Sequence, residues 1–368
     1  MKKILFLITD LERGGAEKNL FNLVLNLPQE EFLPCVVSLS GEGFYGKKLR
    51  EKGVRVYSLY MKGKNLPHSL SKLRKILKEF SPHILHTFLF HANLAGRIMG
   101  RLCGVPVVIS SVRVMEKEKL WHLLLERITR GLIDREIEVC QALREFRRKT
   151  IGLSENKMVV IYNGLEEVSW EDVPAIPREK LGIPPSGFLI GTLSRLTLQK
   201  GLPYLILAMK IVLKRIPFAY LIIAGKGEKE SELKGMVRRL GIEERVKFRG
   251  FEENPLSFLR SLDLFVLPSL WEGLPNSLLE AQALGIPAVV TDVGGNPEIV
   301  KDGETGIVVP SRDSISLAGG IIYLGENKAI RLRMGEKAKR VREIFPLRRM
   351  IEEHLILYRE LLPDKFSP

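Results

Sequence analysis

WEGLPNSLLEAQALGIPAVVTDVGGNPEIVKDGETGIVVP, residues 271–310, contains a short apolar helix, an apolar strand and a glycine loop in direct succession. Asn276 or Ser277 can cap the start of the helix. Gly285 fits the left-handed position after its last turn, and Pro287 prevents the helix from continuing. The run AVVTDVGG that follows is bounded by glycines, which is typical of a buried strand in a parallel sheet. The segment therefore predicts one helix–strand unit of an α/β fold.

Two glutamates stand at the start of this predicted helix. Glu272 precedes the helix, Glu280 lies in its first turns, and a loop with Gly294 and Gly295 follows the strand. This arrangement predicts a cradle for a polyol attached to an anion. An alternative stays open for Glu280, because Ser277 and Glu280 fit the S-x-x-E capping box, in which the carboxylate bonds to its own helix.

Composition and length limit the classes of protein. A chain of 368 residues with 45% hydrophobic and 27% charged residues suits a globular protein of two domains. The opening run MKKILFLITD ends at Asp10 without a small-residue cleavage site, which favours a first buried strand over a signal peptide. Cys35, Cys103 and Cys140 form no C-x-x-C pair, so we expect neither a disulfide framework nor a zinc site, and we expect a cytoplasmic location.

The positive charge is concentrated in the first half of the chain. Residues 1–170 carry 28 Lys and Arg against 18 Asp and Glu, which accounts for 10 of the net +14. This excess indicates an anionic partner, either a phosphorylated acceptor or a lipid surface, with a solvated basic surface as the alternative. We expect no nucleic-acid partner, because the chain has no recognised binding motif.

Apolar runs alternate with helical patterns along the whole chain, which predicts parallel, doubly wound sheets. In the first half the expected strands are residues 3–9, 35–39, 55–59, 84–87, 107–110, 136–140 and 158–162. In the second half they are residues 188–193, 220–224, 246–249, 264–267, 288–291 and 307–309. Residues 166–187 contain four prolines and no apolar period, so a domain boundary is expected there.

Ligands of such sheets bind outside the carboxyl ends of the strands, which draws attention to the loops that follow them. In the first half, Gly14 and Gly15 begin a helix where backbone N–H groups could approach a phosphate, although such a pair is more often only a turn. His86 ends a strand, His91 begins a helix, and Arg113 follows another strand.

In the second half, Arg195 and Lys200 lie in the loop SRLTLQKG between a strand and a helix. Two cations converging on a helix N-terminus predict an anion site, with solvated loop cations as the alternative. Gly225 follows the next strand, but the third glycine of a dinucleotide fingerprint is replaced by Glu230. Cations suit a pyrophosphate and carboxylates suit sugar hydroxyls, so the combination fits a nucleotide sugar. The chain has no D-x-D motif and no His/Cys cluster, so we expect no metal and no other cofactor.

These motifs resemble those of the retaining glycosyltransferases of family 4 (glycosyl transferases group 1), which have the GT-B fold. The resemblance rests on SRLTLQKG, AGKGE, KFRGF and the segment from DLFVLPS to GIVVP, together with GGAE, HTFLFHANLAGR and VIYNG. It covers nearly the whole chain, and the E-x7-E spacing followed by GIP-x-V and GG-x-PE is specific.

The resemblance implies two Rossmann-like domains facing a cleft, formed by residues 1–168 and 169–345, with a C-terminal helix at 346–368 packing back onto the first domain. It implies that Arg195 and Lys200 bind the donor diphosphate, that Glu272 contacts the hexose near the reacting carbon and that Glu280 holds the ribose. The remaining donor-binding positions that it implies are Gly14, Gly15, Gly225, Phe248, Arg249, Gly250, Leu274, Pro275, Asn276 and Ser277.

One position departs from the family pattern. Many relatives have a histidine after the strand that matches residues 107–111, where this chain has SSVRV. Arg113 is therefore interpreted as a contact to an anionic acceptor or to the leaving diphosphate, with a surface cation as the alternative. His86 and His91 are the other acceptor-side candidates.

Residues 117–130, KEKLWHLLLERITR, indicate where the acceptor comes from. Lys, Arg and Trp121 among leucines are typical of an interfacial helix, although a buried amphipathic helix has the same pattern. The hypothesis is hexosyl transfer with retention to a lipid-linked acceptor at an anionic membrane surface, in the synthesis of cell-surface polysaccharide, lipopolysaccharide or glycolipid. A catalytically weak nucleotide-sugar-binding subunit and a sugar-nucleotide epimerase of the same fold are the alternatives.

Overall fold

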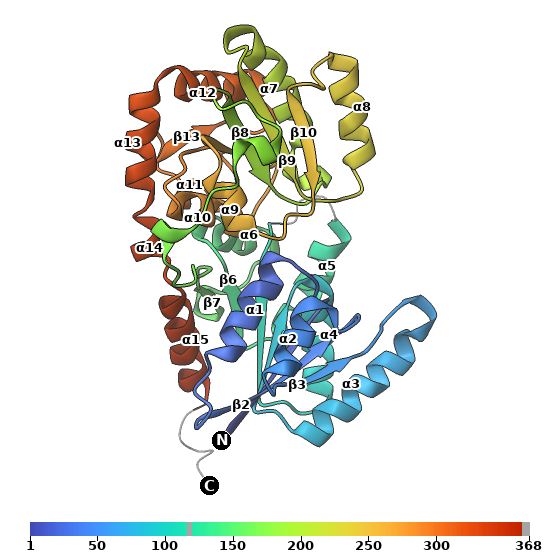
Figure 1. Ribbon diagram of the computed structural model, residues 1–368. Helices are drawn as coiled ribbons and strands as arrows, with labels where there is room; N and C mark the ends of the chain where they lie inside the picture. The colour runs from blue at the N-terminus through green and yellow to red at the C-terminus, as the bar shows by residue number, and fades with distance from the viewer. Residues whose placement is uncertain (116–119, 363–368) are drawn as a thin grey trace. The chain divides into compact units, whose positions relative to one another are not determined.

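The computed structural model describes residues 1–115 and 120–362, and the chain forms two compact units (Figure 1). Unit 1 consists of Met1–Gly164 and Leu347–Pro368, and unit 2 of Leu165–Pro346. The sequence placed the boundaries at 168/169 and 345/346. The last residues of the expected C-terminal segment, 363–368, lie outside the described residues, as do the first three residues of the expected interfacial helix, 117–119.

Unit 1 contains a parallel sheet of seven strands in the order β3-β2-β1-β4-β5-β6-β7. The strands are β1 (Lys2–Ile8), β2 (Phe32–Ser38), β3 (Arg55–Ser58), β4 (Ile84–Phe88), β5 (Val107–Val112), β6 (Arg135–Glu138) and β7 (Met158–Val160). Its helices are α1 (Gly15–Leu25), α2 (Gly43–Glu51), α3 (Leu66–Phe80), α4 (Phe90–Leu102), α5 (Leu120–Thr129), α6 (Gln141–Ile151) and α15 (Leu347–Leu361). The strand order reverses between β1 and β4, so this pair is the topological switch point.

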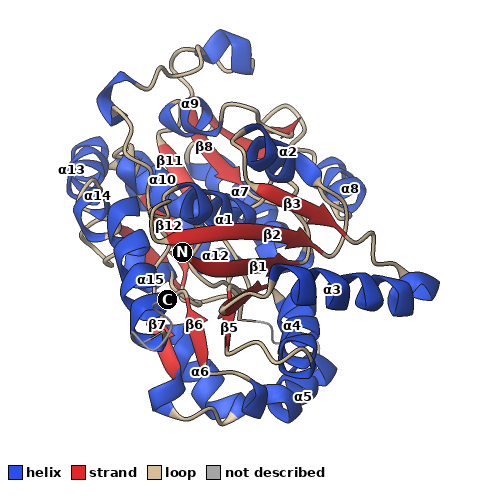
Figure 2. Cartoon of the chain, turned by 90° about the horizontal axis from the view of Figure 1, so that it is seen from below, coloured by secondary structure: helices blue, strands red, loops and turns tan. Residues whose placement is uncertain are grey.

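Both faces of this sheet are covered, as the apolar strands require. In β1 the side chains alternate between two cores, with Phe6 in one and Leu7 in the other. Helices α1 and α15 cover the first face, and α3 and α4 cover the second. In Figure 2, α3, α4 and α5 follow one another along one side of the sheet, and α5 also contacts α6.

Helix α15 joins unit 1 through one apolar face. Met350, Ile351, Leu355 and Tyr358 are separated by one, four and three positions, which places them on one side of a helix, and all four are buried against the core that contains β1 and β4. The C-terminal segment therefore completes one face of a sheet that begins at residue 2.

Unit 2 contains a parallel sheet of six strands in the order β10-β9-β8-β11-β12-β13. The strands are β8 (Phe188–Leu193), β9 (Ala219–Ala224), β10 (Val246–Gly250), β11 (Leu264–Leu267), β12 (Ala288–Thr291) and β13 (Gly306–Val309). Its helices are α7 (Leu202–Arg215), α8 (Glu230–Leu240), α9 (Pro255–Arg260), α10 (Asn276–Ala283), α11 (Asn296–Ile299), α12 (Ser314–Glu326), α13 (Lys328–Ala338) and α14 (Val341–Ile344). The switch point lies between β8 and β11. Two parallel, doubly wound units confirm the predicted fold class.

The start of α10 differs from the prediction. Pro275 occupies the N-cap position with extended backbone and no side-chain cap, and Asn276 is already helical. Neither Asn276 nor Ser277 caps this helix, and Ser277 lies one residue inside it. The capping box requires its serine at the N-cap, so that interpretation of Ser277 and Glu280 is wrong. Gly285 has φ +76°, which confirms the left-handed turn after the helix.

Candidate functional site

The carboxyl edge of the unit 2 sheet is built from loops that pack backbone against backbone. Gly225 follows β9 with φ +138°, and a Cβ there would lie 1.9 Å from the Ser194 carbonyl oxygen. Gly294 follows β12 with φ +54°, and a Cβ there would lie 2.5 Å from the Glu272 carbonyl oxygen. Only glycine fits such approaches. The loops after β8, β9, β11 and β12 are therefore held together as one edge.

Lys200 and Glu272 lie at the centre of this edge. They form an ion pair between the loop after β8 and the loop after β11, which places the pair at the switch point of the sheet. Glu272 is 4% exposed, and the Lys200 side chain is 12% exposed. The structure thus brings together two residues that the sequence separates by 72 positions.

Two further side chains hold Glu272. The Ser269 hydroxyl donates to Oε1 at 2.6 Å, and the Gln199 amide donates to Oε2 at 3.3 Å and to the Trp271 carbonyl at 3.0 Å. The sequence analysis missed both residues. Their positions in the sequence could have identified them as site residues, since Gln199 adjoins Lys200 and Ser269 follows strand β11 by two residues. Glu272 therefore has a defined orientation.

Arg195 lies in the same loop as Lys200 and is exposed. Within residues 1–115 and 120–362, Arg195 makes no ion pair, so its guanidinium is open to an anionic ligand. The first turn of α10 has backbone N–H groups without intrahelical partners, and Leu274, Pro275, Asn276 and Ser277 form this start. Glu280 is buried in the body of α10.

The end of β10 contributes mainly backbone to this edge. The Phe248 ring packs against the apolar core of unit 2, with the Lys234 ammonium 5.6 Å from its centroid. Arg249 is exposed and forms an ion pair with Glu252. The Gly250 carbonyl accepts a hydrogen bond from the Gly225 N–H at 2.6 Å. Phe248, Arg249 and Gly250 thus reach the edge, but the Phe248 side chain is turned toward the core.

In unit 1, Gly14 and Gly15 begin helix α1, as predicted, and Gly14 is its N-cap. The Glu17 carboxylate lies over Gly14, because a Cβ at Gly14 would lie 2.1 Å from Glu17 Oε2. A carboxylate thus occupies the space beside this helix N-terminus, where negative charge is favourable.

His86 is fully buried within unit 1, and both of its ring nitrogens have partners. Nδ1 lies 2.6 Å from the Tyr358 hydroxyl of α15, and Nε2 lies 2.8 Å from the Ser111 hydroxyl. Burial, His354 and Arg113 together hold the pKa of His86 well below its usual value, so the ring is neutral. His86 thus lies in the middle of β4 and not, as the sequence predicted, at its end, and its ring joins α15 to the sheet.

Arg113 and His91, the other two acceptor-side candidates, differ in exposure. Arg113 is buried, donates to Asn163 Oδ1 at 2.8 Å and has its pKa lowered by burial to about 10, so it remains a cation at pH 7. His91 is exposed in the first turn of α4, with its ring edge-on to Phe90. His86, His91 and Arg113 thus form no common surface group.

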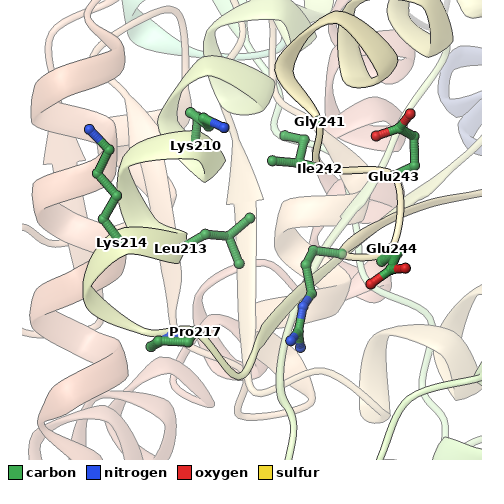
Figure 3. Close-up of a pocket in the computed structure, with 9 residues that line it drawn as sticks. Lys210, Leu213, Lys214, Pro217, Gly241, Ile242, Glu243 and Glu244 are labelled. Carbon is green, nitrogen blue, oxygen red and sulfur yellow. The ribbon is translucent and has the colours of Figure 1, made fainter.

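A pocket of about 570 Å³ lies elsewhere in unit 2 (Figure 3). Lys210, Leu213 and Lys214 of α7 line it together with residues 241–245, which lead into the amino end of β10. None of the predicted site residues lines this pocket. Among residues 1–115 and 120–362, no three His, Cys, Asp or Glu side chains gather as they would around a metal ion.

Comparison with known proteins relates both units to glycosyltransferases. Residues 13–167 match the sequence model of Glycosyltransferase Family 4, and residues 175–341 match that of Glycosyl transferases group 1. The chain is 28% identical over 312 residues to the UDP-Gal:alpha-D-GlcNAc-diphosphoundecaprenol alpha-1,3-galactosyltransferase of Escherichia coli, covering 81% of this chain and 80% of that protein. It is 37% identical over 143 residues to the lipopolysaccharide core biosynthesis mannosyltransferase LpsB of Rhizobium meliloti, covering 37% and 41%.

The solved structures agree with the observed topology. Anabaena Alr3699/HepE in complex with UDP-glucose superposes with a TM-score of 0.85 at 22% identity, covering 98% of this chain and 100% of that chain. Sucrose-phosphate synthase from Thermosynechococcus elongatus superposes with a TM-score of 0.82 at 19% identity, covering 98% and 99%. The two units are therefore the Rossmann-like domains of the GT-B fold.

Proposed function

We propose that this chain is a retaining glycosyltransferase of family 4 that transfers a hexose from a nucleoside-diphosphate sugar to an acceptor hydroxyl. The observation that carries the proposal is the Lys200–Glu272 pair, held by Gln199 and Ser269 at the switch point of unit 2. Beside it, the exposed Arg195 and the start of α10 supply further positive charge. The similarity to enzymes of polysaccharide and lipopolysaccharide synthesis supports the same conclusion.

The proposed chemistry follows from the charge of the leaving group. As the bond between the sugar C1 and the diphosphate oxygen breaks, that oxygen gains negative charge, and the acceptor oxygen bonds to C1 and gives its proton to the departing diphosphate oxygen. Arg195, Lys200 and the N–H groups of α10 stabilise the diphosphate, and one such preorganised donor typically contributes about 10²–10³ in rate. Transfer on the same face of the sugar retains its configuration.

The ion pair also suggests how the donor engages Glu272. A diphosphate at Lys200 competes with Glu272 for the ammonium, which frees Glu272 Oε1 to accept a hydrogen bond from a hexose hydroxyl. Ser269 and Gln199 hold the carboxylate in place during this exchange. Glu280 would hold the ribose, and the backbone near Gly225 and Gly250 would face the base.

No metal or other cofactor is part of this proposal, since Arg195, Lys200 and the helix start supply the charge that a metal would otherwise provide. The proposed acceptor is lipid-linked, because the name of the Escherichia coli relative specifies a diphosphoundecaprenol acceptor. We place the enzyme in the cytoplasm at the inner face of the membrane, and the free thiols of Cys35, Cys103 and Cys140 support a reducing compartment. In the part of the chain that the structure describes, no helix has the length and apolarity to cross a bilayer.

The test is a panel of nucleotide sugars scored first by thermal stabilisation. A donor at 100 times its dissociation constant adds about 2.7 kcal/mol to the free energy of unfolding. Release of free nucleoside diphosphate upon addition of lipid-linked acceptors then measures transfer. Glu272→Gln should abolish transfer, whereas Glu304→Gln, at an exposed loop position of the same unit, should have no effect. A protein that no nucleotide sugar stabilises would contradict the proposal.

A second candidate is a nucleotide-sugar-binding subunit of low activity, because SSVRV replaces the family histidine after β5. In that case a donor stabilises the protein but no diphosphate is released with any acceptor. An epimerase of the same fold would convert the donor sugar without an acceptor, which product analysis detects.

A further inference from the structure

Helix α5 has its polar and apolar faces inverted relative to an ordinary surface helix. Leu120, Trp121, Leu124 and Ile128 are exposed by 73, 55, 59 and 69%. The buried residues of the same helix are His122, Glu126 and Thr129. A surface helix normally turns its apolar stripe to the core and its polar residues to water. This helix therefore presents an apolar stripe to its surroundings.

A buried network of charges holds α5 in this orientation. Glu126 forms an ion pair with Arg147 of α6, and Arg147 also donates to both oxygens of Glu136 on β6 at 2.7 and 2.8 Å. Arg97 of α4 donates to Glu136 at 2.9 Å and to the Thr129 hydroxyl at 3.3 Å. Rolling α5 to bury its leucines would withdraw Glu126 and leave Glu136 to neutralise both Arg97 and Arg147, so one buried positive charge would be uncompensated, which is unfavourable. The exposed apolar face is therefore a property of the packed unit.

The neighbouring helix extends this face. Helix α4 contacts α5, and the Phe90 ring of α4 stacks on His122 at 3.4 Å and lies edge-on to Trp121 at 5.7 Å. On α4, Ile98 and Leu102 lie four residues apart and are exposed by 40 and 71%. Figure 2 shows the two helices side by side along one side of the sheet. These two side chains and the four of α5 are thus exposed on adjacent helices.

Cations accompany this surface. Arg127 is exposed on the same side of α5, between Leu124 and Ile128. Burial raises the pKa of the Cys103 thiol, next to Leu102, and the positive charges of Arg74 and Lys78 offset part of this rise. These two exposed cations of α3 therefore lie beside the end of α4. The chain as a whole carries a net charge of +14.

We propose that the exposed face of α4 and α5, formed by Ile98, Leu102, Leu120, Trp121, Leu124 and Ile128, docks this protein onto an anionic lipid bilayer. Leucines and a tryptophan with cations around them suit a helix that lies in the plane of the headgroups, with its apolar side toward the acyl chains. A helix of this length, about 15 Å, lies on a bilayer and does not cross it. A second copy of the chain is a poorer occupant, because a two-fold contact would bring the same cations opposite one another.

The inference deepens the proposed function, since a lipid-linked acceptor resides in the bilayer on which this face would rest. The chain also contains its own reporter. Of its three tryptophans, Trp170 and Trp271 are buried and Trp121 is exposed. A change in tryptophan emission on adding lipid therefore reports on α5.

The experiment mixes the full-length protein with phosphatidylcholine vesicles, with and without phosphatidylglycerol. We expect a blue shift of the Trp121 emission with the anionic vesicles and quenching by brominated acyl chains, both absent in Trp121→Phe. In co-sedimentation, the double variant Leu124→Glu/Ile128→Glu should lower the vesicle-bound fraction at least tenfold. Leu332→Glu, at an exposed leucine of α13 in unit 2, is the matched control and should bind as the wild type does.

Donor binding, measured by thermal stabilisation with UDP-sugars, should be the same in all these variants. If no UDP-sugar stabilises the wild type, the proposed function is contradicted, and the result of the membrane experiment still holds. Equal binding of the wild type and the double variant to anionic vesicles would overturn the membrane proposal. Equal binding of the wild type to neutral and to anionic vesicles would also overturn it. A concentration-dependent dimer in sedimentation velocity that is absent in the double variant would overturn it as well.

Discussion

At the switch point of unit 2, Lys200 and Glu272 bridge the loops that follow the strands, whereas at the switch point of unit 1 His86 lies in the middle of β4 and is enclosed by Ser111 and Tyr358. The two sheets have the same winding and both reverse their strand order at a neighbouring pair of strands. Topology alone would therefore assign a ligand site to each of them.

The difference lies in what surrounds the polar groups of each unit. In unit 2, glycines at 225 and 294 let the loops approach without side chains, and Lys200 and Glu272 lie in the loops after β8 and β11. In unit 1, helix α15 returns from the end of the chain and brings Tyr358 and His354 against His86. The polar groups of the two switch points thus differ in position, since His86 lies within a strand under α15 and Lys200 and Glu272 lie in loops beyond the strands.

The largest effect is expected for Lys200→Ala. Loss of the ammonium should lower kcat/KM for sugar transfer by about 10²–10³, because the proposed function assigns it to the leaving diphosphate. The melting temperature should fall as well, because buried Glu272 loses its ion-pair partner, so transfer is measured well below the melting temperature of the variant. Lys210→Ala, an exposed lysine of α7, is the control and should keep full activity. Transfer within a few-fold of the wild type would refute the role of Lys200.

The pH dependence of stability tests the buried contact of α15 with the unit 1 sheet. Burial lowers the pKa of His354 from 6.5 to about 4, with Arg113 adding to the shift and the Met350 carbonyl opposing it. The unfolded chain therefore binds more protons between these values, so the stability is complete above about pH 6.5 and is lost as the pH falls toward 4. Urea unfolding measures the free energy of unfolding of the wild type and of His354→Gln. The difference between the two, in favour of the wild type, should decrease by up to about 3 kcal/mol from pH 7 to pH 4. If the free energies of unfolding of the two proteins changed with pH in parallel, burial would not lower the pKa of His354.

Gly225→Ala tests the packed loops of unit 2. A methyl group there would meet the Ser194 carbonyl in a backbone conformation that L-residues rarely adopt, so we expect a loss of about 2 kcal/mol in stability. Donor affinity should weaken as well, because the loops after β8 and β9 must separate. At Gly241 φ is +65° and a Cβ would have open space around it. Gly241→Ala should therefore lower the free energy of unfolding by only about 1 kcal/mol and leave donor binding unchanged. Equal effects of the two substitutions would argue against the close packing of these loops.

Tyr358→Phe is expected to have the smallest effect. It removes the hydroxyl partner of His86 Nδ1 and should cost about 1–2 kcal/mol of unfolding free energy, since a buried ring nitrogen is left unsatisfied. Donor binding in unit 2 should not change. Tyr323→Phe, at a half-exposed tyrosine of α12, is the control for loss of a hydroxyl. Weaker donor binding in Tyr358→Phe would show that the contact of Tyr358 with His86 influences the donor site.

The strands and the fold class were predictable because their signal is local. Apolar runs such as residues 264–267 and 288–291 are central strands covered on both faces, so composition alone marks them. The start of α10 was not predictable to the residue, because Pro275 and Ser277 both suit a helix N-terminus. His86 was misjudged for a similar reason, since only the return of α15 buries it.

The sequence by itself determined that the chain forms two doubly wound units and that Lys200, Glu272 and Arg195 lie at the carboxyl edge of the second. These conclusions depend on short apolar runs and on which loop follows which strand. Only the tertiary structure decided that Lys200 pairs with Glu272, that His86 is enclosed and that α5 turns its leucines outward. The physical reason is that an amphipathic pattern has two faces, and partners distant in the chain, such as Glu136 and Arg147 for α5, determine which face is buried.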